Sequence, residues 1–236
     1  PMMKAATMFL RMTPKVTDPK VNAATTLSVP PADAPPPAYL RDRYDVQTTT
    51  VDGRMVWTVA PRSAPSRWHI LYTHGGAFVM ATSETYWSVV DNLIQSTGAT
   101  VTLPAYAVAQ EGDFHGTYAL LRKVYDDLLR TTPAEDIVLM GDSAGGNLAL
   151  VQALEIRDAG LPLPGRVILY SPWLDLSLSD PAAEQLEPID VMLDVDVLQA
   201  DAALWAGGVN LRSPRLSPLY ADLSGLPPID LYMGTH

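Results

Sequence analysis

The spacing of apolar and polar residues predicts a chain in which strands and helices alternate. From Tyr44 to Val59 the pattern has a period of two, and Asp52-Gly53 interrupts it, which is typical of a β-hairpin at the start of a sheet. Short apolar runs further along indicate buried strands. These predicted strands cover residues 68–73, 99–103, 136–140, 166–171 and 227–234.

Apolar stripes with helical spacing lie between these strands. The predicted helices cover residues 83–98, 118–129 and 143–160. Regular alternation of strands and helices favours an α/β fold with a mostly parallel sheet and helices on both of its faces. The alternation stops between Pro172 and Leu226, where a stretch rich in Leu, Val and Asp predicts a helical insert over the strand ends.

The first part of the chain has a different composition from the rest. Residues 2–12 are interpreted as an amphipathic helix, and the proline-dense segment 29–37 as an extended connector. We therefore divide the chain into an N-terminal cap segment with its connector (1–43) and an α/β core (44–236), with a cap insert at about 175–210.

Composition and charge narrow the class of protein. An apolar fraction of 47% in 236 residues supports one globular domain, and the net charge of −10 argues against nucleic acid as a partner. The lack of cysteine excludes disulfides and thiol catalysis, and no apolar run approaches the length of a membrane span. We expect a cytoplasmic protein, and its oligomeric state has two alternatives, a monomer and a homodimer.

One serine has the surroundings of a nucleophile. Gly141-Asp142-Ser143-Ala144-Gly145 ends an apolar run and leads into a helix, which is the spacing of a nucleophile elbow. The N–H group of Ala144 falls in the first helical turn, where unpaired N–H groups and the helix dipole favour an anion. The alternative is a chance match in a glycine-containing loop.

A second glycine motif follows another predicted strand. The N–H groups of His74-Gly75-Gly76-Ala77 are expected at the carboxyl edge of the sheet, the same edge that presents Ser143. Oxyanion holes are built at that edge. The alternative is a turn that only joins a strand to a helix.

These motifs, in this order, resemble those of the hormone-sensitive-lipase-like esterases of the alpha/beta-hydrolase fold, in the subgroup whose elbow reads Gly-Asp-Ser-Ala-Gly. The resemblance covers most of the chain and rests on residues 74–78, 141–147, 171–175 and 226–228. It implies that Ser143 is the nucleophile. It also implies a cap formed by the N-terminal helix and the 175–210 insert.

The resemblance further implies an oxyanion hole made by the N–H groups of Gly75, Gly76 or Ala77 together with that of Ala144. Ala77 replaces one glycine of the family's His-Gly-Gly-Gly, and we expect little effect because alanine is small and keeps its N–H group. A weaker match is the loop 106–111, which lacks the arginine and proline of the family's Tyr-Arg-Leu-Ala-Pro-Glu.

The residues that activate the serine are missing from these 236 residues. In the family, the Asp of the triad follows the last strand seen here, and the His comes after one further helix and strand. The four histidines are poor substitutes. His69 lies away from the active edge, His74 is expected to brace the oxyanion loop, His115 to be exposed, and His236 to occupy no family role.

We expect the natural chain to continue with Asp directly after His236 and to carry a His later, because a bare parallel edge and an uncovered apolar face are unfavourable. The expected activity is hydrolysis of short- to medium-chain acyl esters through an acyl-enzyme, with a small-molecule ester as the partner and no cofactor or metal. The alternative is a catalytically dead or incomplete binding protein that has lost the Asp and His.

Acidic residues give no further site in this interpretation. Eight of them lie between Asp175 and Asp201 without the spacing of metal ligands, and they are interpreted as a solvated cap face. Asp142 is expected to support the elbow, and Asp175 to be a structural loop residue.

Overall fold

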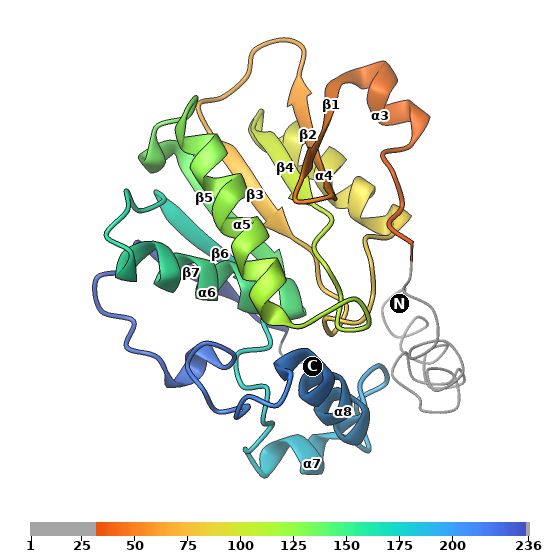
Figure 1. The fold of residues 1–236 in the computed structure, drawn as a ribbon. Helices are drawn as coiled ribbons and strands as arrows, with labels where there is room; N and C mark the ends of the chain where they lie inside the picture. Colours follow the sequence, from red (N-terminus) through yellow and green to blue (C-terminus); the bar gives the residue numbers. More distant parts are fainter. Residues whose placement is uncertain (1–31, 235–236) are drawn as a thin grey trace.

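The computed structural model describes residues 32–234, and the helix expected at 2–12 and His236 lie outside this range. The described chain forms one seven-stranded sheet in the order β1-β2-β4-β3-β5-β6-β7 (Figure 1). The strands are β1 (Tyr44–Val51), β2 (Arg54–Pro61), β3 (His69–Thr73), β4 (Thr100–Pro104), β5 (Ile137–Asp142), β6 (Arg166–Tyr170) and β7 (Ile229–Tyr232).

Helices cover both faces of this sheet, as expected. They are α3 (Ala38–Arg43), α4 (Glu84–Thr97), α5 (Phe114–Leu129), α6 (Ser143–Asp158), α7 (Ala182–Leu186) and α8 (Val195–Ala206), with short 3₁₀ turns at Ala134–Asp136 and Pro218–Tyr220. One core cluster joins α5 and α6 to one face, and a second joins α3 and α4 to the other (Figure 1). The α/β class with a mostly parallel sheet is confirmed.

The first two strands form the predicted hairpin. Asp52 and Gly53 both have positive φ, at 49° and 79°, which is the conformation of a type I′ turn. β2 pairs with β4 in the antiparallel direction, whereas β4, β3, β5, β6 and β7 run parallel to one another. Because the parallel strands share a direction, the loops that follow them leave from one edge.

The register at that edge brings two of these loops together. Thr73 at the end of β3 pairs with Gly141, and Asp142 at the end of β5 pairs with Tyr170 of β6. The glycine motif after β3 and the serine motif after β5 therefore start side by side.

The core begins earlier in the chain than the boundary at residue 43 implied. Leu40 of α3 is fully buried in the cluster on the α4 face. A six-residue helix is too short to show a periodic apolar stripe, so α3 was not expected from the sequence.

The insert between β6 and β7 carries α7 and α8, in agreement with the expected helical region. The Asp194 side chain accepts a hydrogen bond from the Val197 N–H group at the start of α8. Both ends of the insert are tied to α6, because the Asn147 amide donates to the carbonyls of Trp173 and Leu216, each at 2.8 Å.

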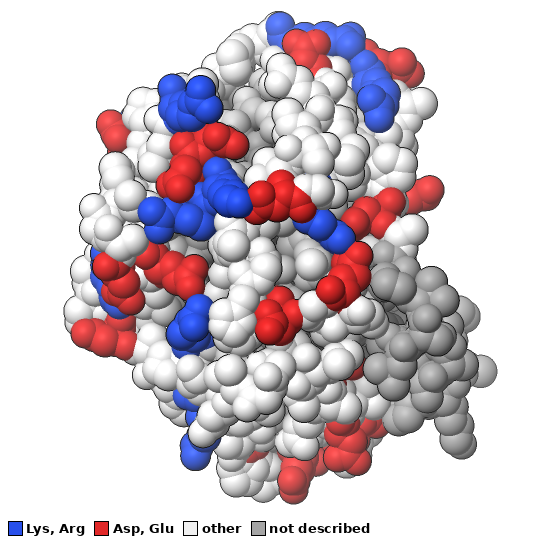
Figure 2. Space-filling view, viewed as in Figure 1, with Lys and Arg blue, Asp and Glu red and all other residues white. Residues whose placement is uncertain are grey.

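The visible surface carries charges of both signs. In Figure 2, basic and acidic groups lie next to each other on the side of α5, where Arg122 pairs with Asp126. At the other side of the sheet, Leu231 and Tyr232 of β7 are more than half exposed, at 54% and 53%. No helix of residues 32–234 is both long and apolar enough to cross a membrane.

Candidate active site

Ser143 lies at a sharp turn from β5 into α6. Its φ is 50°, in the left-handed region that costs a side-chain-bearing residue about 1–2 kcal/mol. The turn also needs glycine at two neighbouring positions. A Cβ on Gly145 would overlap the carbonyl oxygens of Thr73 and His74, and one on Gly141 would overlap the Gly145 carbonyl. The sequence pattern of the elbow is therefore a steric requirement of this fold.

The start of α6 faces the active edge with unpaired backbone donors. Asp142 precedes the helix, but its side chain makes no capping hydrogen bond to it. The N–H groups of the first turn, including that of Ala144, therefore keep the positive end of the helix dipole open to an anion.

The loop after β3 packs directly against this turn. A Cβ on Gly75 would lie 3.1 Å from the Ser143 Cβ, so a side chain there would crowd Ser143. The loop then closes on itself, because the Gly76 carbonyl accepts from the N–H groups of Val79 and Met80 at 3.0 and 2.9 Å. Ala77 and Phe78 both have positive φ, at 51° and 63°. Ala77 is thus small enough for the loop but carries backbone strain.

Gly75 differs from the expectation. Its N–H group donates to Asp142 Oδ1 at 3.0 Å and to the Tyr86 hydroxyl at 2.9 Å, so it is already paired. Within residues 32–234 the N–H groups of Gly76 and Ala77 make no hydrogen bond. The oxyanion hole stays a prediction, and these hydrogen bonds favour Gly76, Ala77 and Ala144 over Gly75 as its donors.

His74 occupies the bracing position expected for it. The ring is fully buried, its Nδ1 lies 2.7 Å from the Gly75 carbonyl oxygen, and it stacks on Tyr106 with centroids 4.2 Å apart. Burial lowers the pKa of His74 to about 4, so the imidazole is neutral near pH 7. The Tyr106 hydroxyl also donates to the His74 carbonyl at 2.7 Å, which fixes the start of the loop after β3.

The loop 106–111 is held in place although it departs from the family pattern. Arg54 pairs with Glu111 at 2.7 Å and donates to the carbonyl oxygens of Ala105 and Tyr106. The other Glu111 oxygen accepts from the Val108 N–H group at 3.1 Å. An ion pair from β2 therefore fixes the loop that carries Tyr106.

The other histidines in the described part of the chain contact groups other than Ser143. His69 is at the opposite end of β3 and contacts the Thr102 hydroxyl at 2.7 Å. His115 is exposed near the start of α5, with its ring nitrogen 3.1 Å from Asp113. Together with His74, all three hydrogen-bond to groups other than the Ser143 hydroxyl.

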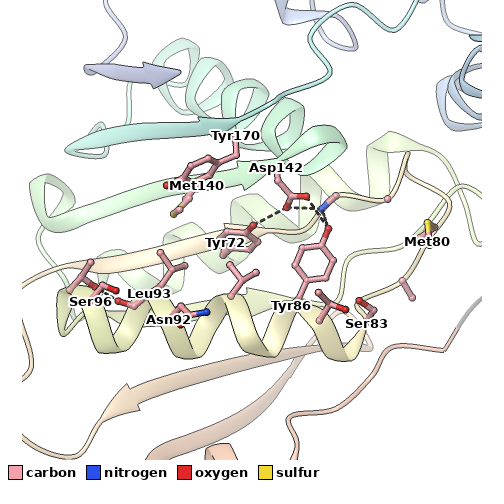
Figure 3. Close-up of a pocket in the computed structure, with 16 residues that line it drawn as sticks. Tyr72, Met80, Ser83, Tyr86, Asn92, Leu93, Ser96, Met140, Asp142 and Tyr170 are labelled. Atoms are coloured by element: carbon pink, nitrogen blue, oxygen red, sulfur yellow. Dashed lines mark hydrogen bonds between the residues drawn. The ribbon is translucent and has the colours of Figure 1, made fainter. Parts of the chain in front are cut away.

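A carboxylate with two tyrosines was not found from the sequence. Asp142 Oδ1 accepts from the Tyr72 hydroxyl at 2.9 Å, and Oδ2 accepts from the Tyr86 hydroxyl at 3.0 Å. Figure 3 shows both rings pointing at Asp142 from different elements. Burial first, and then the charge of Asp142, raise the pKa of both tyrosines, so both phenols keep their protons. Both tyrosines lie in apolar stretches of the sequence, so the sequence did not indicate that their hydroxyls bind Asp142.

A cavity of about 860 Å³ begins beside these groups and continues along α4 (Figure 3). Gly76 and Asp142 line the end nearest the active edge, and Leu93 and Met140 line its apolar part. The candidate site thus borders an open apolar space on the α4 face of the sheet.

The acidic residues of the insert have structural partners or lie at the surface. Asp175 accepts hydrogen bonds from Ser177, Ser179 and the Tyr220 hydroxyl, which agrees with a structural loop role. Among residues 32–234 no group of three or more His, Asp or Glu side chains is placed to hold a metal ion.

Comparison with known proteins gives consistent similarities. A family profile described as "alpha/beta hydrolase fold" matches residues 70–236. The chain is 36% identical to a triacylglycerol lipase of Mycobacterium tuberculosis, over 80% of this chain and 39% of that protein. It is 31% identical to an acetyl-hydrolase of Streptomyces hygroscopicus, over 70% of this chain and 56% of that protein.

Solved structures agree with the sequence relatives. The fold matches an esterase from the bacterial hormone-sensitive lipase family with a TM-score of 0.80 and 28% identity, over 98% of this chain and 77% of that one. The chain spans only 39% and 56% of the two curated relatives named above.

Proposed function

The chain belongs to the alpha/beta-hydrolase fold family as a hormone-sensitive-lipase-like member, and from that membership we propose that it is a serine carboxylesterase for short- to medium-chain acyl esters. The observation that carries the proposal is the strained Ser143, with φ of 50°, at a strand-to-helix turn beside a loop of unpaired N–H groups. A nucleophile and its oxyanion donors have this arrangement.

In the proposed reaction, Ser143 Oγ bonds to the ester carbonyl carbon and its proton passes to a general base. The N–H groups of Gly76 or Ala77 and of Ala144 stabilise the resulting oxyanion. The tetrahedral intermediate collapses by breaking the bond to the alcohol, which leaves with a proton. Water then cleaves the acyl-serine ester and releases the carboxylic acid.

The base is assigned from the family resemblance to a histidine oriented by an aspartate. The assay uses the full-length gene product. The complete protein is expected to hydrolyse p-nitrophenyl acetate and butyrate, and Ser143→Ala to abolish this hydrolysis. Ser88→Ala, on the exposed side of α4, is the control that keeps the rate. Equal rates for Ser143→Ala and the parent would contradict the assignment.

A second candidate function is a binding protein that keeps the pocket without the catalysis. Within residues 32–234, the rings of His69, His74 and His115 hydrogen-bond to groups other than Ser143. None of these histidines is therefore placed as a base for Ser143, which favours the binding protein. A fluorophosphonate probe separates the two functions because it modifies an activated serine. Labelling of the complete protein at Ser143 supports the esterase, and its absence supports the binding protein.

A further inference from the structure

Four groups from four parts of the chain meet beside the nucleophile. Asp142 ends β5, Gly75 belongs to the loop after β3, Tyr72 comes from β3 and Tyr86 from α4 (Figure 3). Asp142 accepts hydrogen bonds from the other three groups, including one from the Gly75 N–H at 3.0 Å. The Tyr86 hydroxyl adds a second bridge between Gly75 and Asp142. It accepts from the Gly75 N–H at 2.9 Å and donates to Asp142 Oδ2 at 3.0 Å.

These hydrogen bonds join the two halves of the proposed site. Asp142 is the residue directly before Ser143, and Gly75 is the residue directly before Gly76. A displacement of Gly75 relative to Asp142 therefore moves the candidate oxyanion donors relative to the nucleophile. Since oxyanion stabilisation depends on donors held about 2.7–3.1 Å from the developing charge, this link controls a geometry to which the rate is sensitive.

We propose that Tyr86 is a positioning residue of the esterase, which fixes the oxyanion loop against the nucleophile elbow through its hydroxyl. The proposal rests on the proposed function. Tyr86 acts through Gly75 and Asp142 and touches no reacting atom in this role. Its ring, in contrast, has a packing role, because it lies 5.3 Å from the His74 ring and 6.2 Å from the Tyr72 ring.

The test removes the hydroxyl and keeps the ring. In the complete gene product, Tyr86→Phe is expected to lower kcat for p-nitrophenyl butyrate by at least about tenfold, with KM within about twofold of the parent. The matched control is Tyr125→Phe, which removes a hydroxyl that donates to the Pro162 carbonyl at 2.8 Å from α5, on the other face of the sheet. This control is expected to leave kcat unchanged.

A second measurement does not depend on turnover. The backbone amide of Gly75 is expected to exchange its hydrogen several times faster in Tyr86→Phe than in the parent, as followed by NMR, and at the parent rate in Tyr125→Phe. Both variants are first compared with the parent by urea unfolding, so that a loss of folded protein is not read as a loss of rate.

The outcomes separate the two proposals. A complete parent protein that hydrolyses no ester overturns the proposed function and this proposal with it. A parent that hydrolyses the ester, with Tyr86→Phe equally fast or with Gly75 exchange unchanged, overturns only the role of Tyr86. A fall in kcat that Tyr125→Phe matches would likewise reduce Tyr86 to a general contribution to stability.

Discussion

The ring of Phe78 stacks on the ring of Trp205, with centroids 4.7 Å apart and planes 9° apart. Phe78 belongs to the candidate oxyanion loop and has a φ of 63°, and Trp205 belongs to α8 of the insert. Both side chains are fully buried. The insert is therefore packed onto the strained part of the loop, so its helix contributes to holding that loop.

Trp205→Ala removes the stacking partner and leaves a cavity over Phe78. We expect a loss of about 3–5 kcal/mol in the free energy of unfolding, the usual cost of truncating a buried aromatic side chain. Urea unfolding measures this loss. The neighbouring residue provides the control, because Leu204 is 38% exposed and Leu204→Ala should change stability by much less. Similar losses in both variants would show that the Phe78–Trp205 contact contributes no more to stability than an exposed leucine side chain does.

Ala77→Gly is expected to stabilise the protein. A φ of 51° strains the backbone of alanine in the folded protein but not that of glycine. Glycine also makes the unfolded chain more flexible, which opposes folding, but the relief of strain is the larger effect. We expect a gain of about 0.5–1 kcal/mol in urea unfolding. Ala203→Gly, at an exposed position of α8, should instead lose about 1 kcal/mol. A loss in both variants would argue against strain at Ala77.

Two glycines differ sharply in the space around them. A Cβ on Gly145 overlaps the Thr73 carbonyl, whereas one on Gly116 in α5 meets no atom within 4 Å. Gly145→Ala is therefore expected to destabilise the elbow by about 3 kcal/mol or more, as overpacking against backbone does. Gly116→Ala should stabilise by up to about 1 kcal/mol through helix propensity. Thermal unfolding of both variants checks the contrast, and a tolerated Gly145→Ala would contradict the close packing.

Asp201 makes stability depend on pH. Burial raises the pKa of Asp201 from 3.8 to about 6, so the folded protein binds this proton more tightly than the unfolded chain. The stabilising effect of the proton is complete below about pH 4 and is lost as the pH rises through about 6. Asp201→Asn should match the parent near pH 4 and exceed it by roughly 1–3 kcal/mol at pH 8.

Unfolding in urea at several pH values, with parent and Asp201→Asn side by side, measures this difference directly. Burial also lowers the pKa of His69 and of His74 to about 4, and those groups are present in both proteins, so their effect cancels in the comparison. A difference between the two proteins that stays constant from pH 4 to pH 8 would rule out the shift at Asp201.

Local patterns in the sequence were enough to predict the sheet and the sharp turn at Ser143. The period of two around Asp52-Gly53 and the glycines around Ser143 follow from short-range sterics, which a sequence displays directly. The six-residue helix around Leu40 was missed because it is shorter than two turns.

The hydrogen bonds of Gly75 and of Tyr86 could not be predicted in the same way. Tyr86 and Asp142 are 56 positions apart, and their contact depends on how α4 lies against β5. A tyrosine in an apolar stripe looks like a core residue in the sequence, so the hydrogen bonds of its hydroxyl could not be predicted. The positive φ of Ala77 was equally hidden, because alanine does not mark such positions as glycine does.

The insert leaves the sheet after β6 and returns at β7, which is its parallel neighbour, with Val167 opposite Ile229. Asn147 of α6 holds both ends of the excursion through the carbonyls of Trp173 and Leu216. Segments between these two anchors can lengthen, shorten or be exchanged while the strand register stays the same. A segment exchanged between these anchors therefore preserves the sheet, but it must also replace the contact of Trp205 with Phe78 if the loop after β3 is to keep its conformation.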